Sequence, residues 1–364
     1  MFNDIYRGRK VLITGHTGFK GTWLSAWLLH LGAEVAGYSI DIPSNPSIFE
    51  ILELEKRVRH HQADIRNRDT LSAVVREFKP EIVFHLAAQA LVRKSYADPA
   101  YTFETNGIGT LNMLECMRCS DSIKAAVMIT SDKCYRNQEW TWGYRENDIL
   151  GGNDPYSASK GCAEIIAQSY FSSFFRPKNC PKAATTRAGN VIGGGDWAQD
   201  RIVPDCIRAW SQGQPVTVRQ PEATRPWQHV LEPLSGYLWL GALLWQNRPK
   251  ACFEAFNFGP PASVNQSVGE LITAMSQHWP GGRMIIDRPP EAPLESTLLK
   301  LCCDKALSHL AWQPTLEFVE TVDLTVAWYR QFYAAEQGDL FDFTMGQIDR
   351  YILLAIERRR AWTN

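Results

Sequence analysis

The feature that most constrains the fold is a short apolar run, KVLIT at 10–14, which ends in a glycine-rich turn, TGHTGFKG. The run predicts a strand, and the apolar spacing over 20–33 predicts a helix directly after the turn. Gly15, Gly18 and Gly21 thus form GxxGxxG where a strand passes into a helix. Glycine permits a tight turn and the close approach of backbone amides to a pyrophosphate, to which the helix N-terminus adds partial positive charge. The turn predicts a dinucleotide site, with a ligand-free turn as the alternative.

Strand and helix patterns continue to alternate through the first half of the chain. We expect strands at 33–40, 57–65, 81–88, 124–131 and 182–190, and helices at 69–80, 100–119 and 155–175. Such alternation is typical of βαβ units in a parallel sheet with both faces covered. We therefore predict an α/β fold, a Rossmann-type doubly wound parallel sheet with a smaller α/β substrate-binding lobe. The dinucleotide-binding part is expected over 1–190, with returns near 225–260, and the lobe with the C-terminal helices over 191–364.

Composition excludes several classes of protein. With 45% hydrophobic and 21% charged residues the chain is typical of soluble globular proteins, and its net charge of −1 argues against nucleic-acid or anionic-membrane binding. The longest apolar stretch, GYLWLGALLW, is too short to span a bilayer and predicts a buried helix. The nine scattered cysteines, with no signal peptide in MFNDIYRGRK, indicate free thiols and a cytoplasmic location. The CxxC at Cys116 and Cys119 lacks a second ligand pair at zinc spacing, so we expect no metal.

The ends of the predicted strands supply further candidates for cofactor binding. Asp41 ends the second strand, 20 residues after Gly21. A carboxylate there can accept hydrogen bonds from ribose hydroxyls and repels a 2′-phosphate, which favours NAD over NADP; a solvated loop aspartate is the alternative. The cofactor is expected along the carboxyl ends of the strands. The other expected contacts are Thr17, Phe19, Lys20, Asp64, Ile65, Leu86, Ala87 and Ala88.

Two side chains in the glycine turn can carry positive charge. His16 and Lys20 are bulkier than the small or apolar residues that usually stand in such a turn. We expect both to lie near the cofactor phosphates.

A hydroxyl, a tyrosine and a lysine are predicted to converge at the nicotinamide. Ser131 follows the strand at 124–131, and Tyr156 and Lys160 form YxxxK at the start of the next helix. The i, i+4 spacing places both side chains on one helix face. Lys160 and an oxidised nicotinamide ring would both favour the phenolate and lower the pKa of Tyr156 from its usual value near 10. Such a tyrosine can take a hydroxyl proton while hydride leaves the same carbon, although a chance YxxxK is the alternative.

Together these motifs resemble the extended short-chain dehydrogenase/reductase family. The resemblance rests on GxxGxxG, on HLAA at 85–88, on Asn106 in TNGIGT, and on the set of Ser131, Tyr156 and Lys160. It continues through TRAGNVIGGGDW, RIVPD and TRPWQHV and covers roughly 8–330. It implies a nucleotide-sugar enzyme that uses bound NAD.

Asp132 and Lys133, directly after Ser131, suggest more than simple oxidation. A 4-epimerase of the family needs only the hydroxyl, tyrosine and lysine. A 4,6-dehydratase also needs an acid and a base, because it eliminates water once carbon 4 is a ketone. The Asp-Lys pair and the GHTGFKG turn resemble the branch acting on CDP-D-glucose, which implies Asp132 as the acid and Lys133 as the base. Adjacent opposite charges oppose both roles unless the pair shares one proton. A surface ion pair, another nucleotide-sugar dehydratase or epimerase, and a non-catalytic nucleotide sensor are the alternatives.

The resemblance also suggests how substrate is held and how the chain assembles. Trp140, Trp142 and Tyr144 either cover a sugar or cytosine face or pack a long loop. Helices at 100–119 and 155–175 commonly pair between subunits in this family, so a homodimer or homotetramer is expected. The residues expected to bind the nucleotide diphosphate or the sugar are Asn190, Arg201, Arg219 and Arg225.

Overall fold

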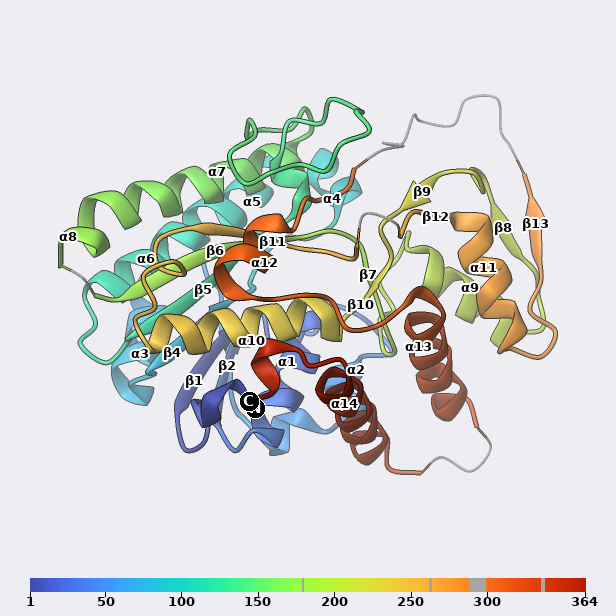
Figure 1. Cartoon of the computed structure of the whole chain (residues 1–364), viewed down its shortest axis with the longest axis horizontal. Coiled ribbons are helices and arrows are strands. Elements are labelled where there is room, and N and C mark those ends of the chain that lie inside the picture. The colour runs from blue at the N-terminus through green and yellow to red at the C-terminus, as the bar shows by residue number, and fades with distance from the viewer. Residues whose placement is uncertain (179, 262–263, 288–298, 335–337) are drawn as a thin grey trace.

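The computed structural model of the chain describes residues 1–178, 180–261, 264–287, 299–334 and 338–364. The central strands are β1 (Lys10–Thr14), β2 (Glu34–Ser39), β3 (Arg59–Gln62), β4 (Ile82–His85), β5 (Ala125–Ile129), β6 (Lys182–Ala188) and β11 (Ala255–Phe258). They form one seven-stranded parallel sheet in the order β11-β6-β5-β4-β1-β2-β3 (Figure 1). The order reverses between β1 and β4, which confirms the predicted Rossmann-type doubly wound sheet.

Helices cover both faces of this sheet. The covering elements are η1 (Phe2–Asp4), α1 (Phe19–His30), α2 (Ile48–Ile51), η2 (Leu54–Lys56), α3 (Arg68–Phe78), α4 (Val92–Ala97), α5 (Pro99–Phe103), η3 (Glu104–Ile108), α6 (Gly109–Arg118), α7 (Pro155–Tyr170), η5 (Phe171–Phe175), α8 (Arg176–Lys178) and α10 (Leu231–Trp245). Successive strand residues point to opposite faces. On β1, Val11 and Ile13 join the core with α1 and α10, whereas Leu12 joins the core with α3, α6 and α7. Both faces are therefore buried in the middle of the sheet, which explains why strands such as β1, β4 and β5 read as nearly continuous apolar runs. The edge strand β3, RHHQ, is polar and partly exposed.

Two of the predicted helices contain a π-helical turn that the sequence pattern does not reveal. The stretch expected as one helix over 100–119 is α5, the π-turn η3 and α6, and α7 passes into the π-turn η5. Asn106 lies in η3 and donates to the Gln89 carbonyl oxygen at 3.1 Å and to Ser159 Oγ at 2.8 Å. The π-turn therefore ties α7 to the segment that follows β4, beside the cofactor end of the sheet.

Most of the remaining elements build a lobe that begins beyond the carboxyl end of β6 (Figure 1). They are β7 (Val191–Ile192), α9 (Ile202–Ser211), β8 (Val216–Val218), β9 (Thr224–Arg225), β10 (Gln228–His229), β12 (Gln266–Ser267), α11 (Val268–Gln277), β13 (Met284–Ile286) and α13 (Phe318–Phe332). Four further elements pack against the sheet domain: η4 (Asp132–Cys134) beside α7, α12 (Asp304–Leu310) beside β11, α14 (Leu340–Glu357) beside α1 and η6 (Ala361–Thr363) beside η1. Three small two-stranded sheets, β10-β7, β12-β9 and β13-β8, support the lobe.

The most apolar helix of the chain lies inside the molecule. GYLWLGALLW falls within α10, whose residues Leu231 to Leu244 are all buried, as predicted. None of the described helices combines the length and the apolar character that crossing a bilayer requires.

Candidate active site

The glycine turn between β1 and α1 keeps the space that a dinucleotide needs. Gly15 has φ +78°, and a Cβ atom on it would lie 2.8 Å from the Ala87 backbone nitrogen. A Cβ atom on Gly21 would lie 2.1 Å from the Gly15 carbonyl oxygen. Gly18 is the N-cap of α1, and no side chain caps the first amides of this helix. The turn thus fits a pyrophosphate, which uncapped amides at a helix N-terminus bind well.

The neighbouring strand ends complete the candidate cofactor site. Thr17 Oγ1 donates to the Asp41 carbonyl oxygen at 2.6 Å, which ties the glycine turn to the end of β2. The Asp41 side chain is exposed there. Leu86, Ala87 and Ala88 directly follow β4 and are half-buried, and the Ala87 amide donates to Thr14 Oγ1 at 3.2 Å. The predicted glycine and strand-end residues therefore lie along one edge of the sheet.

At the end of β3 the two predicted residues differ in their surroundings. Asp64 accepts hydrogen bonds from Arg66 at 2.7 to 2.9 Å. Burial raises the pKa of Asp64 and these bonds lower it, with a net lowering. Ile65 is 4% exposed and packs beneath Gly109 of α6. The Ile65 side chain is part of the hydrophobic core, so Asp64 is the residue at this strand end that could contact a cofactor.

The two bulky residues of the glycine turn do not share one environment, contrary to expectation. The ring of His16 is fully buried beside Gly37, with Nδ1 2.9 Å from Ser39 Oγ and Nε2 2.7 Å from His60 Nδ1. Burial, together with the charge of His60, lowers the pKa of His16 to about 3, so this ring is neutral. The prediction of a cationic His16 beside the phosphates is therefore wrong, because the ring packs inward against β2 and β3.

Lys20 lies close enough to two of the predicted catalytic residues for their charges to act on it. Burial lowers its pKa to about 8, and the charges of Arg201, Asp132 and Lys160 act on it. A cation at this position is thus placed to act on Asp132 as well as on a cofactor.

The predicted catalytic turn follows β5 directly. Ser131 Oγ accepts from the Lys133 amide at 3.2 Å and donates to Asp132 Oδ1 at 2.9 Å. Asp132 is buried, whereas Lys133 is half-buried. Burial raises the pKa of Asp132, and the charge of Lys133 and the Ser131 hydrogen bond only partly oppose this. Desolvation therefore outweighs the adjacent opposite charge, and the pKa of Asp132 moves in the direction that a general acid needs.

Tyr156 and Lys160 project from the first turns of α7. The helix starts at Pro155, and its N-cap Asp154 accepts from the Ser157 amide at 2.9 Å. Burial raises the pKa of Tyr156 to about 12, against the lowering effect of a hydrogen bond with Ser131. Burial lowers the pKa of Lys160 to about 8. Ser131 and Tyr156 are thus brought together as predicted, but the protein groups alone do not lower the tyrosine pKa because burial dominates.

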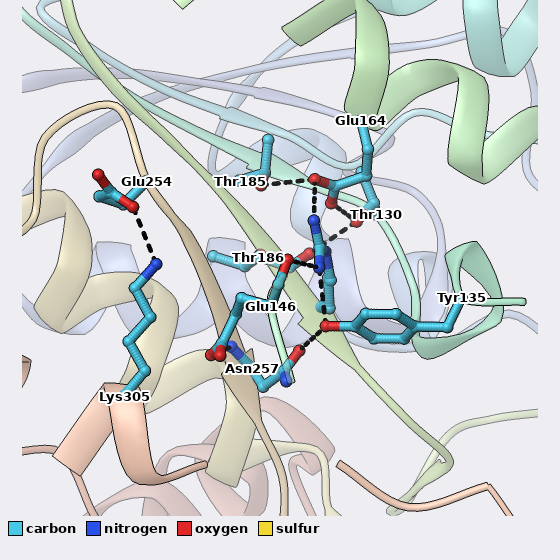
Figure 2. Close-up of polar contacts among 10 residues, drawn as sticks. Thr130, Tyr135, Glu146, Glu164, Thr185, Thr186, Glu254, Asn257 and Lys305 are labelled. Carbon is cyan, nitrogen blue, oxygen red and sulfur yellow. Dashed lines mark hydrogen bonds and ion pairs between the residues drawn. The ribbon is translucent and has the colours of Figure 1, made fainter. Parts of the chain in front are cut away.

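A buried ion pair lies behind these residues. Arg187 Nη2 lies 2.7 Å from Glu164 Oε2, and neither side chain is exposed. Glu164 also accepts from the hydroxyl groups of Thr130 and Thr185, the latter at 2.9 Å (Figure 2). Glu164 is one helical turn beyond Lys160 on α7. The pair therefore holds α7, which carries Tyr156 and Lys160, against β6 and the end of β5.

The same arginine supports the catalytic turn through Tyr135. Arg187 Nη1 donates to the Tyr135 hydroxyl at 2.7 Å, and that hydroxyl donates to Asn257 Oδ1 at 2.8 Å (Figure 2). Asn257 Nδ2 donates to the carbonyl oxygens of Tyr144 and Cys302 at 2.8 and 3.0 Å. Tyr135 directly follows η4, so this chain of hydrogen bonds fixes the turn that carries Asp132 and Lys133.

The aromatic residues of the loop 136–150 mainly pack against each other. Tyr144 stacks on Tyr135 with 5.2 Å between ring centroids, and Trp140 lies 5.2 Å from Tyr144. Trp142 is 71% exposed. Tyr144 also forms a β-bridge with Leu301, and its amide donates to the Lys300 carbonyl oxygen at 2.8 Å. Trp140 and Tyr144 thus pack within the loop and against its neighbours.

Of the predicted substrate ligands, Arg201 is the one that reaches the catalytic residues. Arg201 Nη1 donates to Asp196 Oδ2 at 2.7 Å, and the pKa of Arg201 is raised by Asp196 and by Tyr156. Asn190 is exposed just beyond β6. Arg219 is exposed after β8, and Arg225 Nη1 donates to the Thr224 carbonyl oxygen at 2.9 Å.

The chain shows neither a metal centre nor a disulfide in its described part. All nine cysteines are free. Within the described ranges, no group of three or more His, Cys, Asp or Glu side chains is arranged to hold a metal.

Comparison with known proteins agrees with this geometry. The model of the family described as GDP-mannose 4,6 dehydratase matches residues 12–325. The chain belongs to this family. A family relative, the CDP-glucose 4,6-dehydratase of Salmonella typhimurium, is 47% identical over 337 residues, covering 92% of this chain and 94% of the relative.

Solved structures show the same fold. The UDP-glucose 4-epimerase of Thermus thermophilus in complex with NAD is 26% identical with a TM-score of 0.74, covering 88% of this chain and 99% of that one. The dTDP-glucose 4,6-dehydratase of Bacillus anthracis in complex with NAD is 20% identical with a TM-score of 0.73, covering 89% and 97%. This family member thus shares its fold with both epimerases and dehydratases, so fold alone does not choose between the two reactions.

Proposed function

We propose that this protein is an NAD-dependent CDP-D-glucose 4,6-dehydratase, a hydro-lyase that forms CDP-4-keto-6-deoxy-D-glucose and water. The glycine turn, Asp41 and the residues after β3 and β4 would hold NAD. When bound, NAD supplies a hydride acceptor for carbon 4 and a hydride donor for carbon 6.

The side chains of the protein supply the proton transfers. Tyr156 takes the proton of the carbon 4 hydroxyl, supported by Ser131 and by the nearby Lys160 ammonium. Lys133 takes the proton from carbon 5, which the ketone at carbon 4 makes acidic. Asp132 donates a proton to the hydroxyl leaving carbon 6, so that water departs. When hydride arrives at carbon 6, Lys133 returns its proton to carbon 5. The proton that Tyr156 took from the carbon 4 hydroxyl then replaces the one that Asp132 gave to the water.

The observation that carries the proposal is the buried carboxyl of Asp132 at the same strand end as Ser131 and Tyr156. Burial raises the pKa of this carboxyl, which is the direction that a general acid needs. An epimerase has no use for such an acid, because it only removes and returns a hydride. The 47% identical relative named for this reaction supports the same choice.

The test is incubation of the purified protein with CDP-, UDP-, dTDP- and GDP-glucose in separate reactions. We expect CDP-glucose to lose water and to give the alkaline ultraviolet absorbance of a keto-deoxy sugar. An epimerised product without water loss, or preferred dehydration of another nucleotide sugar, would contradict the proposal.

We further propose that two copies pair through α5, η3 and α7. Phe103, Ile108, Ile165 and Phe174 are exposed on these elements and on η5, 37% to 58% of each, and pairing would bury them. The free cysteines support a reducing, cytoplasmic location. The division into a dinucleotide-binding part over 1–190 and a nucleotide-sugar lobe over 191–364 is part of the same proposal.

A further inference from the structure

One buried amide near the catalytic turn has an unused acceptor. Gln228 lies on β10, opposite Val191 of β7, and is 2% exposed. Its Nε2 donates to the Phe258 carbonyl oxygen at 3.3 Å. A carbonyl oxygen can only accept, so this contact fixes which end of the amide carries the nitrogen. Within the part of the chain that the structure describes, Gln228 Oε1 has no hydrogen-bond partner.

Gln228 lines a small cavity that borders the catalytic acid. Gly189, Pro226, Gly259 and Lys300 are among the other lining residues. A Cβ atom on Gly189 would lie 3.1 Å from Asp132 Oδ2. The absence of a side chain at Gly189 therefore allows the Asp132 carboxyl to lie close to the wall of the cavity.

The chemistry of the amide oxygen restricts what it can bind. A buried acceptor without a partner is unfavourable, so a ligand that donates to it gains affinity. The oxygens of an ionised diphosphate are acceptors and cannot donate. The hydroxyl groups of a hexose can donate, and the hexose is the part of a nucleotide sugar that must approach Asp132.

We propose that Gln228 accepts a hydrogen bond from a ring hydroxyl of the bound hexose and thereby seats the sugar against Asp132. This inference rests on the proposed function, because it takes the ligand to be a nucleotide-hexose. It makes Gln228 a substrate-binding residue that recognises the sugar rather than the nucleotide.

The test compares Gln228→Leu with wild type for binding of CDP-glucose and of CDP, measured by calorimetry on the full chain. Loss of a buried hydrogen bond that leaves a donor unpaired weakens binding by roughly 5- to 150-fold. We expect this loss for CDP-glucose and an unchanged affinity for CDP, which lacks the sugar. Equal affinity of both proteins for CDP-glucose, or equal weakening for CDP, would overturn the inference.

Gln347→Leu is the matched control. Gln347 lies on α14, is 5% exposed, donates through Nε2 to the Leu324 carbonyl oxygen at 2.8 Å and also has an unpartnered Oε1. It differs from Gln228 in lying outside the cleft, so its variant should bind CDP-glucose as wild type does. Weakened binding in this control as well would assign the effect to general destabilisation and overturn the inference.

A measurement on wild type covers the case in which Gln228→Leu does not fold. CDP-hexoses that each lack one ring hydroxyl should bind with unequal affinity, and one of them should lose about as much as the variant does. Equal affinity for the whole series would overturn the role of Gln228 even if dehydration is confirmed. If wild type instead binds a nucleotide-hexose with another base, CDP-glucose is the wrong substrate. The series of sugars that each lack one ring hydroxyl, attached to that other nucleotide, then decides the role of Gln228. If it binds no nucleotide-hexose, both proposals fail.

Discussion

The guanidinium of Arg187 lies 2.7 Å from the carboxylate of Glu164, and both side chains are completely buried. Replacing one partner leaves the other as an uncompensated buried charge. We predict that Arg187→Met lowers the free energy of unfolding by about 3–5 kcal/mol, measured by urea denaturation. The double variant Arg187→Met with Glu164→Gln should recover part of this loss. As a control, Arg7→Met removes an exposed pair with Asp4 and should change stability by less than about 1 kcal/mol. Equal effects of the two single variants would contradict the prediction.

Asp132 and Lys133 are predicted to act after the first oxidation. Asp132→Ala and Lys133→Ala should each retain binding of cofactor and nucleotide sugar but lose dehydration by roughly 100-fold or more, because each removes one proton transfer. Product formation is measured by the alkaline absorbance of the keto sugar, and binding by calorimetry. Full turnover by either variant would refute the assigned role.

Tyr156 is predicted to act before them. In the Lys133→Ala background, adding the sugar should produce reduced cofactor, seen by its absorbance, and adding Tyr156→Phe to that background should abolish this signal. Tyr170→Phe removes a hydroxyl from the other end of α7, where it donates to Glu115 Oε1 at 2.7 Å. That control should leave the signal intact. Reduction that persists without the Tyr156 hydroxyl would exclude it as the base.

The glycine turn is predicted to be indispensable for cofactor binding. In Gly21→Ala the new methyl group would lie 2.1 Å from the Gly15 carbonyl oxygen, so the turn must move. We expect a large loss of NAD affinity in a chain that still folds, measured by fluorescence titration and circular dichroism. Gly346→Ala is the control: a Cβ atom added at Gly346, on α14, would meet no other part of the described structure within 4 Å. This variant should bind NAD normally. Unchanged NAD affinity of Gly21→Ala would count against the proposed pyrophosphate position.

The buried carboxyl of Glu232 predicts a pH-dependent stability. It accepts from the Thr315 amide at 2.9 Å, and burial raises its pKa from 4.5 to about 7. The folded state therefore holds this proton more tightly than the unfolded state. The resulting contribution of Glu232 to the free energy of unfolding is complete below pH 4.5 and is lost as the pH rises to about 7. Relative to Glu232→Gln, wild type should lose on the order of 3 kcal/mol across this window. Unfolding measured at several pH values tests this; a constant difference between the two proteins would contradict it.

Much of the fold could be predicted because most strands of the central sheet are short apolar runs that end in recognisable turns. KVLIT became β1 at the expected residues 10–14, and Ser131, Asp132 and Tyr156 met where the alternation placed them. Their convergence follows from the parallel sheet, since the carboxyl ends of its strands share one edge.

Side-chain directions could not be predicted in the same way. The inward rotation of His16 depends on the space that Gly37 leaves on a neighbouring strand. The pairing of Glu164 with Arg187 joins residues of different elements. The spacing of four residues between Lys160 and Glu164 places both side chains on one face of α7, but it does not identify Arg187 as the partner. The two π-turns could not be predicted either, because the apolar spacing around them is that of an ordinary helix.

The bridge between Tyr144 and Leu301 has a consequence for the order of folding during synthesis. The loop that carries Tyr144 also precedes the catalytic helix, yet its pairing partner is made more than a hundred residues later. All seven strands of the central sheet, the last of them β11, are therefore synthesised before Leu301. The loop in front of α7 gains its pairing partner only after the whole sheet has been made.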